Sequence, residues 1–181
     1  MKKILLYLLL ITSVYANNSD AKVYVGASIG YLNESFSESN YDSLSTQVAN
    51  IKVGYGVINS YAVELSFDYI PNNKNSFSTN DKDRYGINLE LIKAFDFDMF
   101  FYPFFKTGFG AGYMDIATTN NDSLSYSSYN LGFGCFIPLD KQFDVEVGYR
   151  YKFTSYEKVS EGTKSINSHV NMGYVGLNMR F

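Results

Sequence analysis

Apolar and polar residues alternate with a period of two along most of this sequence, and no other feature constrains the fold as strongly. Val145 and Val147, for example, flank Glu146. A helix would place apolar residues three and four positions apart, whereas successive side chains of a strand point to opposite faces. The pattern therefore predicts strands in eight segments: 22–32, 47–56, 61–70, 83–94, 100–114, 127–137, 143–153 and 169–181.

The bulky apolar residues of these segments carry odd numbers, whereas nearly all of their glycines and charged residues carry even numbers. Away from the frayed segment ends, Gly173 is the exception among the glycines, and Lys93 is the exception among the charged residues. Since alternate residues of a strand share a face, each predicted strand has one apolar face and one face of small and charged residues. Apart from the frayed segment ends, the even-numbered charged residues are Lys52, Glu64, Asp68, Arg84, Glu90, Lys106, Asp144, Glu146, Arg150, Lys152 and Arg180.

Long and short connections follow one another in strict alternation. The long ones are polar and fall near 33–46, 71–82, 115–126 and 154–168; the short ones fall near 56–60, 95–99 and 138–142. An up-and-down meander gives this alternation when one rim faces outside and the other faces the periplasm. With both chain ends at the short-turn rim, the number of strands must be even.

Alternation by itself leaves open which face lies inside a closed barrel. A soluble lipocalin-like barrel also has eight strands, with an apolar interior and a polar exterior. About seventeen of the Tyr and Phe residues lie on the odd face, which is too bulky for an eight-stranded interior. Exposed to water, this face would far exceed the few hundred Å² usual for a soluble monomer. We therefore predict an all-β, eight-stranded antiparallel up-and-down transmembrane β-barrel, with its odd face toward lipid.

Aromatic residues of the odd face concentrate at the segment ends, which predicts two girdles at the membrane interfaces. One lies toward the long connections and the other toward the short turns, where Phe181 joins it. The predicted girdle residues are Tyr31, Tyr69, Tyr85, Tyr113, Tyr129 and Tyr151 at the first rim and Tyr55, Tyr61, Phe101 and Phe143 at the second.

The N-terminal residues 1–16 have the layout of a cleaved signal peptide. Lys2 and Lys3 precede an apolar run of about 11 residues, and Val14-Tyr15-Ala16 resembles a cleavage site. The run is too short to span a bilayer as a helix. We expect residues 17–181 to form the mature outer-membrane barrel domain, exported through the removed peptide and integral to the cell outer membrane.

Charge and cysteine content exclude several other classes of function. A formal net charge of -3 gives no basic footprint for nucleic acid, and the single Cys135 excludes an intramolecular disulfide. The glycines of 108–112 lack the βαβ context of a dinucleotide site, and the acidic pairs of 81–83 and 96–98 lack a calcium-loop pattern. We predict no cofactor, no metal and no catalytic residue.

Three motifs give the chain a family resemblance over 22–181. The segment 173–181 ends in Phe181 with apolar residues at alternate positions before it, 145–151 is of a familiar penultimate-strand type, and 102–112 is rich in glycine. With these motifs the chain resembles the small eight-stranded outer-membrane barrels of Gram-negative bacteria, the OmpA/OmpX/opacity-type family. The resemblance implies that the outer-membrane assembly machinery reads the C-terminal signal Val175, Leu177, Met179 and Phe181.

The even-face charges comprise six basic and five acidic residues. Because an unpaired ion in a narrow interior costs several kcal/mol, opposite signs are expected to pair. Two hypotheses remain: an ion-pair network that plugs the lumen, or a small gated pore lined by these charges.

An enzymatic hypothesis also has to be weighed, because lipid A-modifying enzymes share this architecture. The only histidine, His169, lies beside Ser168, but its odd number points it outward, away from any inward glutamate. A Ser168/His169/Glu centre is therefore disfavoured, and we predict that the chain is not an enzyme.

The sequence favours a non-enzymatic outer-membrane protein with a structural or surface-interaction, adhesin-like role carried by four long external loops. The alternatives are a narrow, low-conductance pore and, behind it, a lipid A-modifying enzyme. The expected partners are outer-membrane lipid, lipopolysaccharide, the assembly machinery and a host or surface ligand, with no nucleic acid. The barrel is expected to be a monomer. Loop lysines Lys74, Lys82, Lys158 and Lys164 are candidates for contacts with lipopolysaccharide phosphates.

Overall fold

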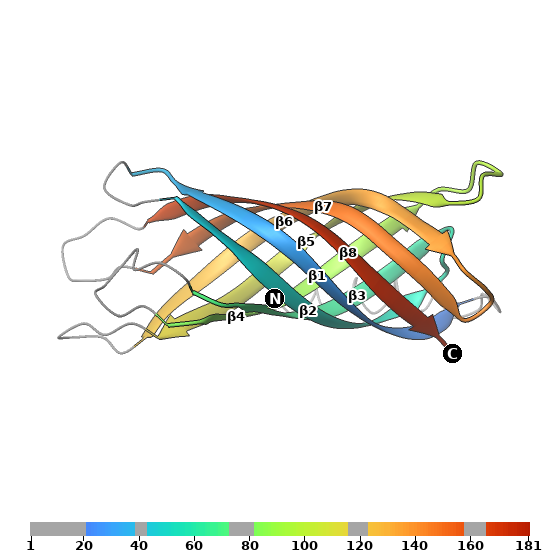
Figure 1. Cartoon of the computed structure of the whole chain (residues 1–181), viewed down its shortest axis with the longest axis horizontal. Coiled ribbons are helices and arrows are strands. Elements are labelled where there is room, and N and C mark those ends of the chain that lie inside the picture. The colour runs from blue at the N-terminus through green and yellow to red at the C-terminus, as the bar shows by residue number, and fades with distance from the viewer. Residues whose placement is uncertain (1–20, 39–42, 73–81, 116–122, 158–165) are drawn as a thin grey trace, which may run out of the picture.

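Eight antiparallel strands close into a barrel in the computed structural model, which describes residues 21–38, 43–72, 82–115, 123–157 and 166–181. Each strand pairs with its neighbours in sequence, and β1 pairs with β8 to close the sheet (Figure 1). The predicted fold is confirmed. The strands are β1 (Lys22–Phe36), β2 (Leu44–Gly56), β3 (Tyr61–Ile70), β4 (Arg84–Ala94), β5 (Tyr102–Asp115), β6 (Ser123–Pro138), β7 (Phe143–Tyr156) and β8 (Asn167–Arg180).

Several strands run further than predicted, and the added residues lie at the rim of the long connections. β1 continues to Phe36 and β7 to Tyr156, while β2 begins at Leu44 and β6 at Ser123. The predicted long connections are shorter by the same residues. At the other rim, the turns 57–60, 95–101 and 139–142 lie close to the predicted positions. We refer to the two ends as the long-connection rim and the short-turn rim.

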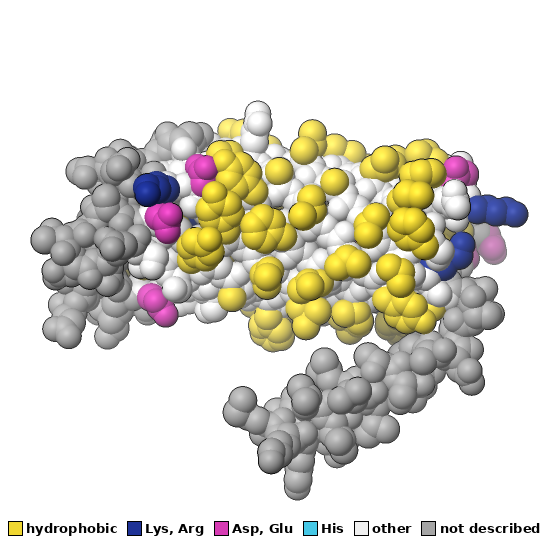
Figure 2. Space-filling model, turned by 90° about the horizontal axis from the view of Figure 1, so that it is seen from below, with side chains coloured by type: hydrophobic (Ala, Val, Ile, Leu, Met, Phe, Trp, Pro, Cys, Tyr) yellow, Lys and Arg dark blue, Asp and Glu magenta, His cyan; other side chains and the backbone are white. Residues whose placement is uncertain are grey.

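The division between even and odd residues holds around the whole wall. Every buried residue within the described strands has an even number, and the exposed bulky residues of the strands are odd-numbered. Figure 2 shows hydrophobic side chains spread over the middle of one outer face, with charged side chains confined to its two ends. The described ranges contain no helix long and apolar enough to cross a membrane. The predicted signal peptide, 1–16, lies outside the described residues and stays a prediction.

Aromatic rings share the interior with the charges, whereas the sequence pattern predicted only small and charged residues on this face. A cluster near the short-turn rim includes Tyr24, Phe104 and Phe136. The rings fill space that inward glycines leave free. A Cβ at Gly54 would lie 2.3 Å from the ring of Tyr24. The interior is thus packed by a complementary fit of glycines and rings, and the charges occupy the remaining space.

Candidate functional site: the charged barrel interior

Twelve charged residues are buried in the interior, six acidic and six basic. Eleven are the even-numbered charges of the sequence analysis, and the twelfth is Glu34, on the extension of β1. The described interior therefore has a formal charge of zero. A balanced set satisfies the requirement that buried ions be paired, because each unpaired one would cost several kcal/mol.

In the half of the barrel toward the short-turn rim, a four-membered ring of charges links opposite walls. Lys106 Nζ lies 2.9 Å from Glu64 Oε1 and 2.8 Å from Glu146 Oε1. Lys52 also bridges the two carboxylates, bonding to Glu146 and lying 3.7 Å from Glu64 Oε2. Tyr24 donates to Glu64 at 2.8 Å. Both carboxylates thus face two ammonium groups, and this cyclic arrangement locks β3 and β7 together through β2 and β5.

An arginine and an aspartate lie between this ring of charges and the short-turn opening. Arg180 Nε donates to Asp144 Oδ2 at 2.7 Å, and its guanidinium lies 4.7 Å from the centre of the Tyr24 ring. Asn178 donates to the other oxygen of Asp144 at 2.7 Å. Asp144 and Arg180 also line a vestibule of about 330 Å³ that opens between the short turns. This pair closes the inner end of the vestibule.

A second cluster fills the middle of the barrel around Asp68. Its carboxylate accepts hydrogen bonds from Asn50 at 2.7 Å and Asn88 at 2.9 Å, and it also binds Lys152. Arg150 Nη2 lies 3.0 Å from Glu90 Oε2 and Arg150 Nη1 lies 3.6 Å from Asp68 Oδ1. Amide side chains thus extend the ion pairs into a continuous network, in addition to the charged residues predicted from the sequence.

The third cluster lies at the long-connection end and is built around Glu34. Its carboxylate binds Arg84 and accepts hydrogen bonds from Tyr156 at 2.7 Å and Ser168 at 2.6 Å. Tyr156 is also an acceptor for Arg84 at 2.7 Å. Between this cluster and Asp68 lies an interior cavity of about 20 Å³, a space of the size of one or two water molecules. Side chains therefore leave only a small space between these two clusters in the part of the interior that the structure describes.

Ser168 and His169 lie on opposite sides of the wall. Ser168 is buried and donates to Glu34, whereas His169 is on the outer face, where its Nδ1 lies 2.5 Å from the hydroxyl of Tyr151. A nucleophile and its base must be within hydrogen-bond reach of each other. In this geometry His169 cannot act as the base for Ser168. The absence of enzymatic activity stays a prediction. Comparing the lipid A of cells that carry His169→Ala with wild type tests it.

None of the predicted girdle residues is buried, and all lie on the outer face of strands except Phe101, which lies in the turn before β5 rather than in the strand as predicted. Tyr69, Tyr85 and Tyr113 form a row on neighbouring strands, with ring centres 5.6 Å apart in each successive pair. The remaining predicted residues at both rims (Tyr31, Tyr55, Tyr61, Phe101, Tyr129, Phe143 and Tyr151) are likewise half-buried or exposed.

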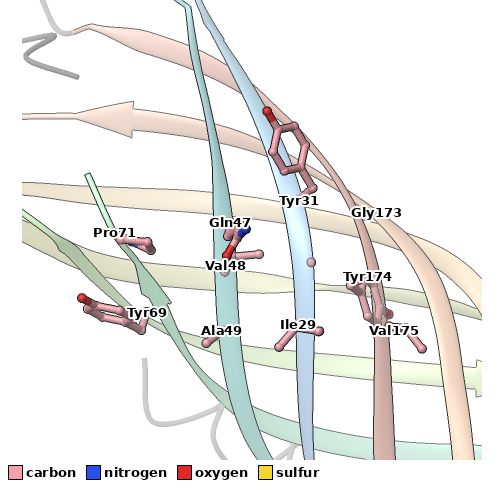
Figure 3. A pocket seen from close by; sticks show the side chains of 11 residues that line it. Ile29, Tyr31, Gln47, Val48, Ala49, Tyr69, Pro71, Gly173, Tyr174 and Val175 are labelled. Atoms are coloured by element: carbon pink, nitrogen blue, oxygen red, sulfur yellow. The ribbon is translucent and has the colours of Figure 1, made fainter. Parts of the chain in front are cut away.

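An outer-face groove of about 550 Å³ crosses β8, β1, β2 and β3 below the long-connection rim. Figure 3 shows Tyr31 and Tyr69 projecting beside it, with the small side chain of Ala49 between β1 and β3. Gly173 also lines the groove, and a Cβ at this position would meet no atom within 4 Å. Gly173, the one odd-numbered glycine of the described strands, therefore leaves a gap in the outer surface, and no neighbouring atom requires a glycine at this position.

The predicted C-terminal signal residues line the outer side of β8. Val175 and Leu177 are exposed, Met179 is half-buried, and Phe181 follows the strand and donates its backbone N–H to Val23. Their reading by the assembly machinery stays a prediction. Among the loop lysines, Lys82 is exposed, while Lys74, Lys158 and Lys164 lie outside the described residues. No group of metal-ligating residues occurs in the part of the chain that the structure describes.

Residues 4–181 match the model of a family described as the outer membrane protein beta-barrel domain. The chain belongs to this family. It has no sequence match among curated proteins. Membership and fold together make it an outer-membrane β-barrel protein, as the resemblance implied, with its odd face toward lipid.

Solved outer-membrane barrels share the architecture at low sequence identity. Neisserial surface protein A is 18% identical, with a TM-score of 0.70, over 89% of this chain and 99% of that chain. Ail, the attachment invasion locus protein of Yersinia pestis, in complex with the heparin analogue sucrose octasulfate, is 16% identical, with a TM-score of 0.60, over 90% and 99%. OprG of Pseudomonas aeruginosa is 10% identical, with a TM-score of 0.54, over 90% and 96%. At these identities the likeness is one of fold.

Proposed function

We propose that this outer-membrane barrel is a non-enzymatic, non-conducting platform with a structural and surface-interaction role carried by its four long connections. The observation that carries the proposal is the interior network of six acidic and six basic residues, all of them buried. A pore needs mobile water between its charges, whereas these charges bind one another and the tyrosine and amide groups around them. The wall then acts as a rigid support, and the four long connections are the parts of the protein that bind other surfaces.

The position of the connections supports the same role. The strand ends that flank all four long connections lie at one rim, opposite the short turns (Figure 1). Loops on a rigid scaffold are where binding residues concentrate in proteins. Because lipid surrounds the middle of the barrel, this rim is the part of the molecule that an external surface reaches first.

Planar-bilayer recording separates the platform from the runner-up, a narrow low-conductance pore. The purified barrel is expected to give no channel events. Two variants are recorded beside the wild type. Lys106→Ala opens space within the charge ring of Lys52, Lys106, Glu64 and Glu146. Lys141→Ala is the matched control, because it removes a lysine of the short turn 139–142 instead. Stepwise conductance in the wild-type protein would overturn the non-conducting role.

Adhesion assays test the surface role. Segments 38–42 and 158–165 are replaced by glycine-serine linkers of equal length, which keeps Glu34 and Ser168 in their strands. We expect weaker adhesion of bacteria that carry these variants, while the heat-modifiable gel mobility of the folded barrel is retained. Heparin serves as the first soluble probe, because the fold relative Ail was solved with a heparin analogue. Unchanged adhesion after replacement of all four connections would contradict the proposal.

A further inference from the structure

The turn between β4 and β5 carries a cluster of apolar side chains that the barrel does not cover. All residues from Phe95 to Phe100 are exposed, with Phe97 61% and Phe100 79% accessible and Met99 42%. We refer to residues 95–101 as the aromatic turn. Exposed apolar groups that lie singly on a surface need no explanation, but a contiguous group of this kind marks an interaction site.

The other two turns of the same rim are more polar. Residues 57–60 are half-buried and end in Asn59 and Ser60, while 139–142 contains one exposed apolar residue, Leu139, followed by Asp140, Lys141 and Gln142. A general need for apolar residues at the short-turn rim would affect all three turns alike. The difference therefore belongs to the aromatic turn itself.

Local contacts order the aromatic turn. The backbone N–H of Phe95 donates to the carbonyl of Pro103 at 2.8 Å, which continues the β4–β5 ladder beyond the strands. The rings of Phe95 and Phe97 stack with their centres 6.0 Å apart. Asn59 donates to the Asp96 carboxylate at 2.8 Å and ties this turn to its neighbour. Asp98 adopts a left-handed φ of 57°, which reverses the chain.

The polar side of the turn stays charged. Asp96 accepts hydrogen bonds from the Asn59 amide and from the backbone N–H of Asp98, and these bonds hold the pKa of its carboxyl below the ordinary value. Phe95 and Phe97 flank the acid Asp96, so the odd–even alternation of the wall continues as far as Phe97, before the chain reverses at Asp98. Phe95 and Phe97 are thus continuous with the lipid-facing side of β4, and Met99 and Phe100 follow as exposed apolar residues beyond the reversal.

The direction of the turn decides what this apolar side meets. In Figure 1 the β4–β5 connection extends past the rim and leans away from the barrel axis. When a ribbon at the rim leans outward, its formerly outer face turns toward the membrane that surrounds the barrel. The apolar side then meets the leaflet and the acidic side meets water.

Lys93 lies beside this turn and marks the level of the lipid headgroups. It is the odd-numbered charged residue of β4, and its Nζ lies 4.0 Å from the ring centre of Tyr61 and 5.6 Å from that of Phe95. Lysines near the ends of membrane segments extend their ammonium groups toward the interface while their stems stay in apolar surroundings. The aromatic turn therefore begins at the depth where phospholipid phosphates are found.

We propose that the aromatic turn is a membrane-interface anchor, in which Phe95, Phe97, Met99 and Phe100 insert into the headgroup and acyl boundary of the periplasmic phospholipid leaflet. Continuity with the lipid-facing wall and the cation at Lys93 favour lipid over a protein as the occupant. The anchor fixes the depth and tilt of the barrel, and it does not depend on the role of the long connections.

Tryptophan fluorescence tests the anchor, because the chain contains no tryptophan. Phe97→Trp and Phe100→Trp each place one reporter in the aromatic turn, and Gln142→Trp places a matched reporter in the polar turn at the same rim. The purified variants are reconstituted into phosphatidylcholine vesicles with and without brominated acyl chains, and the folded state of each is checked by gel mobility. We expect brominated lipid to remove most of the emission at 97 and 100 and aqueous iodide to quench only the reporter at 142.

The Gln142→Trp control also shows whether tryptophan inserts into lipid by itself. In that case brominated lipid would quench the emission at all three positions, and this result would overturn the proposal. Iodide quenching at 97 and 100 equal to that at 142 would overturn it as well. If the reporters are protected in native outer membranes but not in purified vesicles, a protein covers the turn and the lipid anchor is wrong.

Discussion

At the two rims of the barrel, the strands and the apolar outer surface extend to different distances. Where β1 ends, the strand extends further, and where β4 ends, the apolar residues extend further. At the long-connection rim, β1 continues through Asn33 and Ser35 on its outer face after the apolar row has ended at Tyr31. At the aromatic turn of the short-turn rim the opposite holds, since β4 ends at Ala94 and exposed apolar residues continue through Phe100.

This difference separates two determinants of the wall. The extent of a strand follows from its backbone hydrogen bonds and its inward side chains, such as Glu34 in the cluster with Arg84 and Tyr156. The extent of the apolar row follows from the thickness of the hydrocarbon, which takes about 9–11 residues of a tilted strand. The two quantities coincide only in the middle of the barrel.

The largest effect is expected from the charge ring near the short-turn rim. Glu146→Ala leaves Lys52 and Lys106 with one shared carboxylate, and removal of one member of a buried ion pair costs about 3–5 kcal/mol. Urea unfolding in vesicles measures the loss, with Glu34→Ala as the comparison at the other rim, where a single cation is affected. Unchanged gel mobility on heating in both Glu146→Ala and Arg150→Ala would count against the network.

The lipid-facing row gives the next largest effect. Val147 lies exposed in the middle of the row on β7, and Val147→Arg is expected to lower the free energy of unfolding by about 2–4 kcal/mol near the bilayer midplane. Gln47→Arg, on the outer face toward the long-connection rim, is expected to cost only about 0–1 kcal/mol. Equal costs at the two positions, measured by the same unfolding assay, would contradict the assigned depth.

Two glycines test the packing of the wall. A Cβ at Gly134 would lie 2.2 Å from the carbonyl oxygen of Val147, whereas one at Gly173 would meet nothing within 4 Å. We expect Gly134→Ala to destabilise the barrel by about 1–3 kcal/mol through overpacking. Gly173→Ala, which adds the same methyl group on the lipid side, is expected to leave the unfolding midpoint unchanged. A cost at Gly173 would show that the groove there has an occupant.

The smallest effect is a pH dependence at the long-connection rim. Asp83 accepts hydrogen bonds from the Tyr69 hydroxyl and the Asn72 backbone N–H, and these bonds lower the pKa of its carboxyl. A lowered pKa contributes stability above the pKa of the unfolded chain, near 4, that is lost as pH falls through the folded value. Unfolding of wild type and Asp83→Asn at neutral and acidic pH should differ only at neutral pH. A difference that persists in acid would contradict this assignment.

Most of the wall was predictable from the sequence because lipid outside and charges inside enforce a strict period of two. The prediction ended too early at the long-connection rim for the same reason. Beyond Tyr31 the outer residues Asn33 and Ser35 are polar, so the alternation disappears although the strand continues. Glu34 was therefore assigned to a connection and left out of the network.

The sequence predicted which charged residues lie in the interior, but it did not predict which of them form ion pairs with one another. Even numbering identified Lys52, Lys106, Glu64 and Glu146 as inward residues, yet their positions in sequence do not show which strands face each other across the interior. The even numbers of Tyr24 and Tyr174 place their rings on the inward face, but the packing of these rings in the interior was not predicted. Their space comes from glycines on neighbouring strands, such as Gly54, and that fit is visible only in three dimensions.

The pairing of β1 with β8 has a consequence for how this molecule enters a membrane. These strands, the most distant of the eight in sequence, meet over thirteen residue pairs, from Tyr24–Arg180 to Phe36–Ser168. A sheet lacking this seam would present two unpaired edges to hydrocarbon, where each unsatisfied backbone group costs several kcal/mol. Insertion and closure are therefore expected to be a single cooperative event, with no stable half-built sheet in the bilayer.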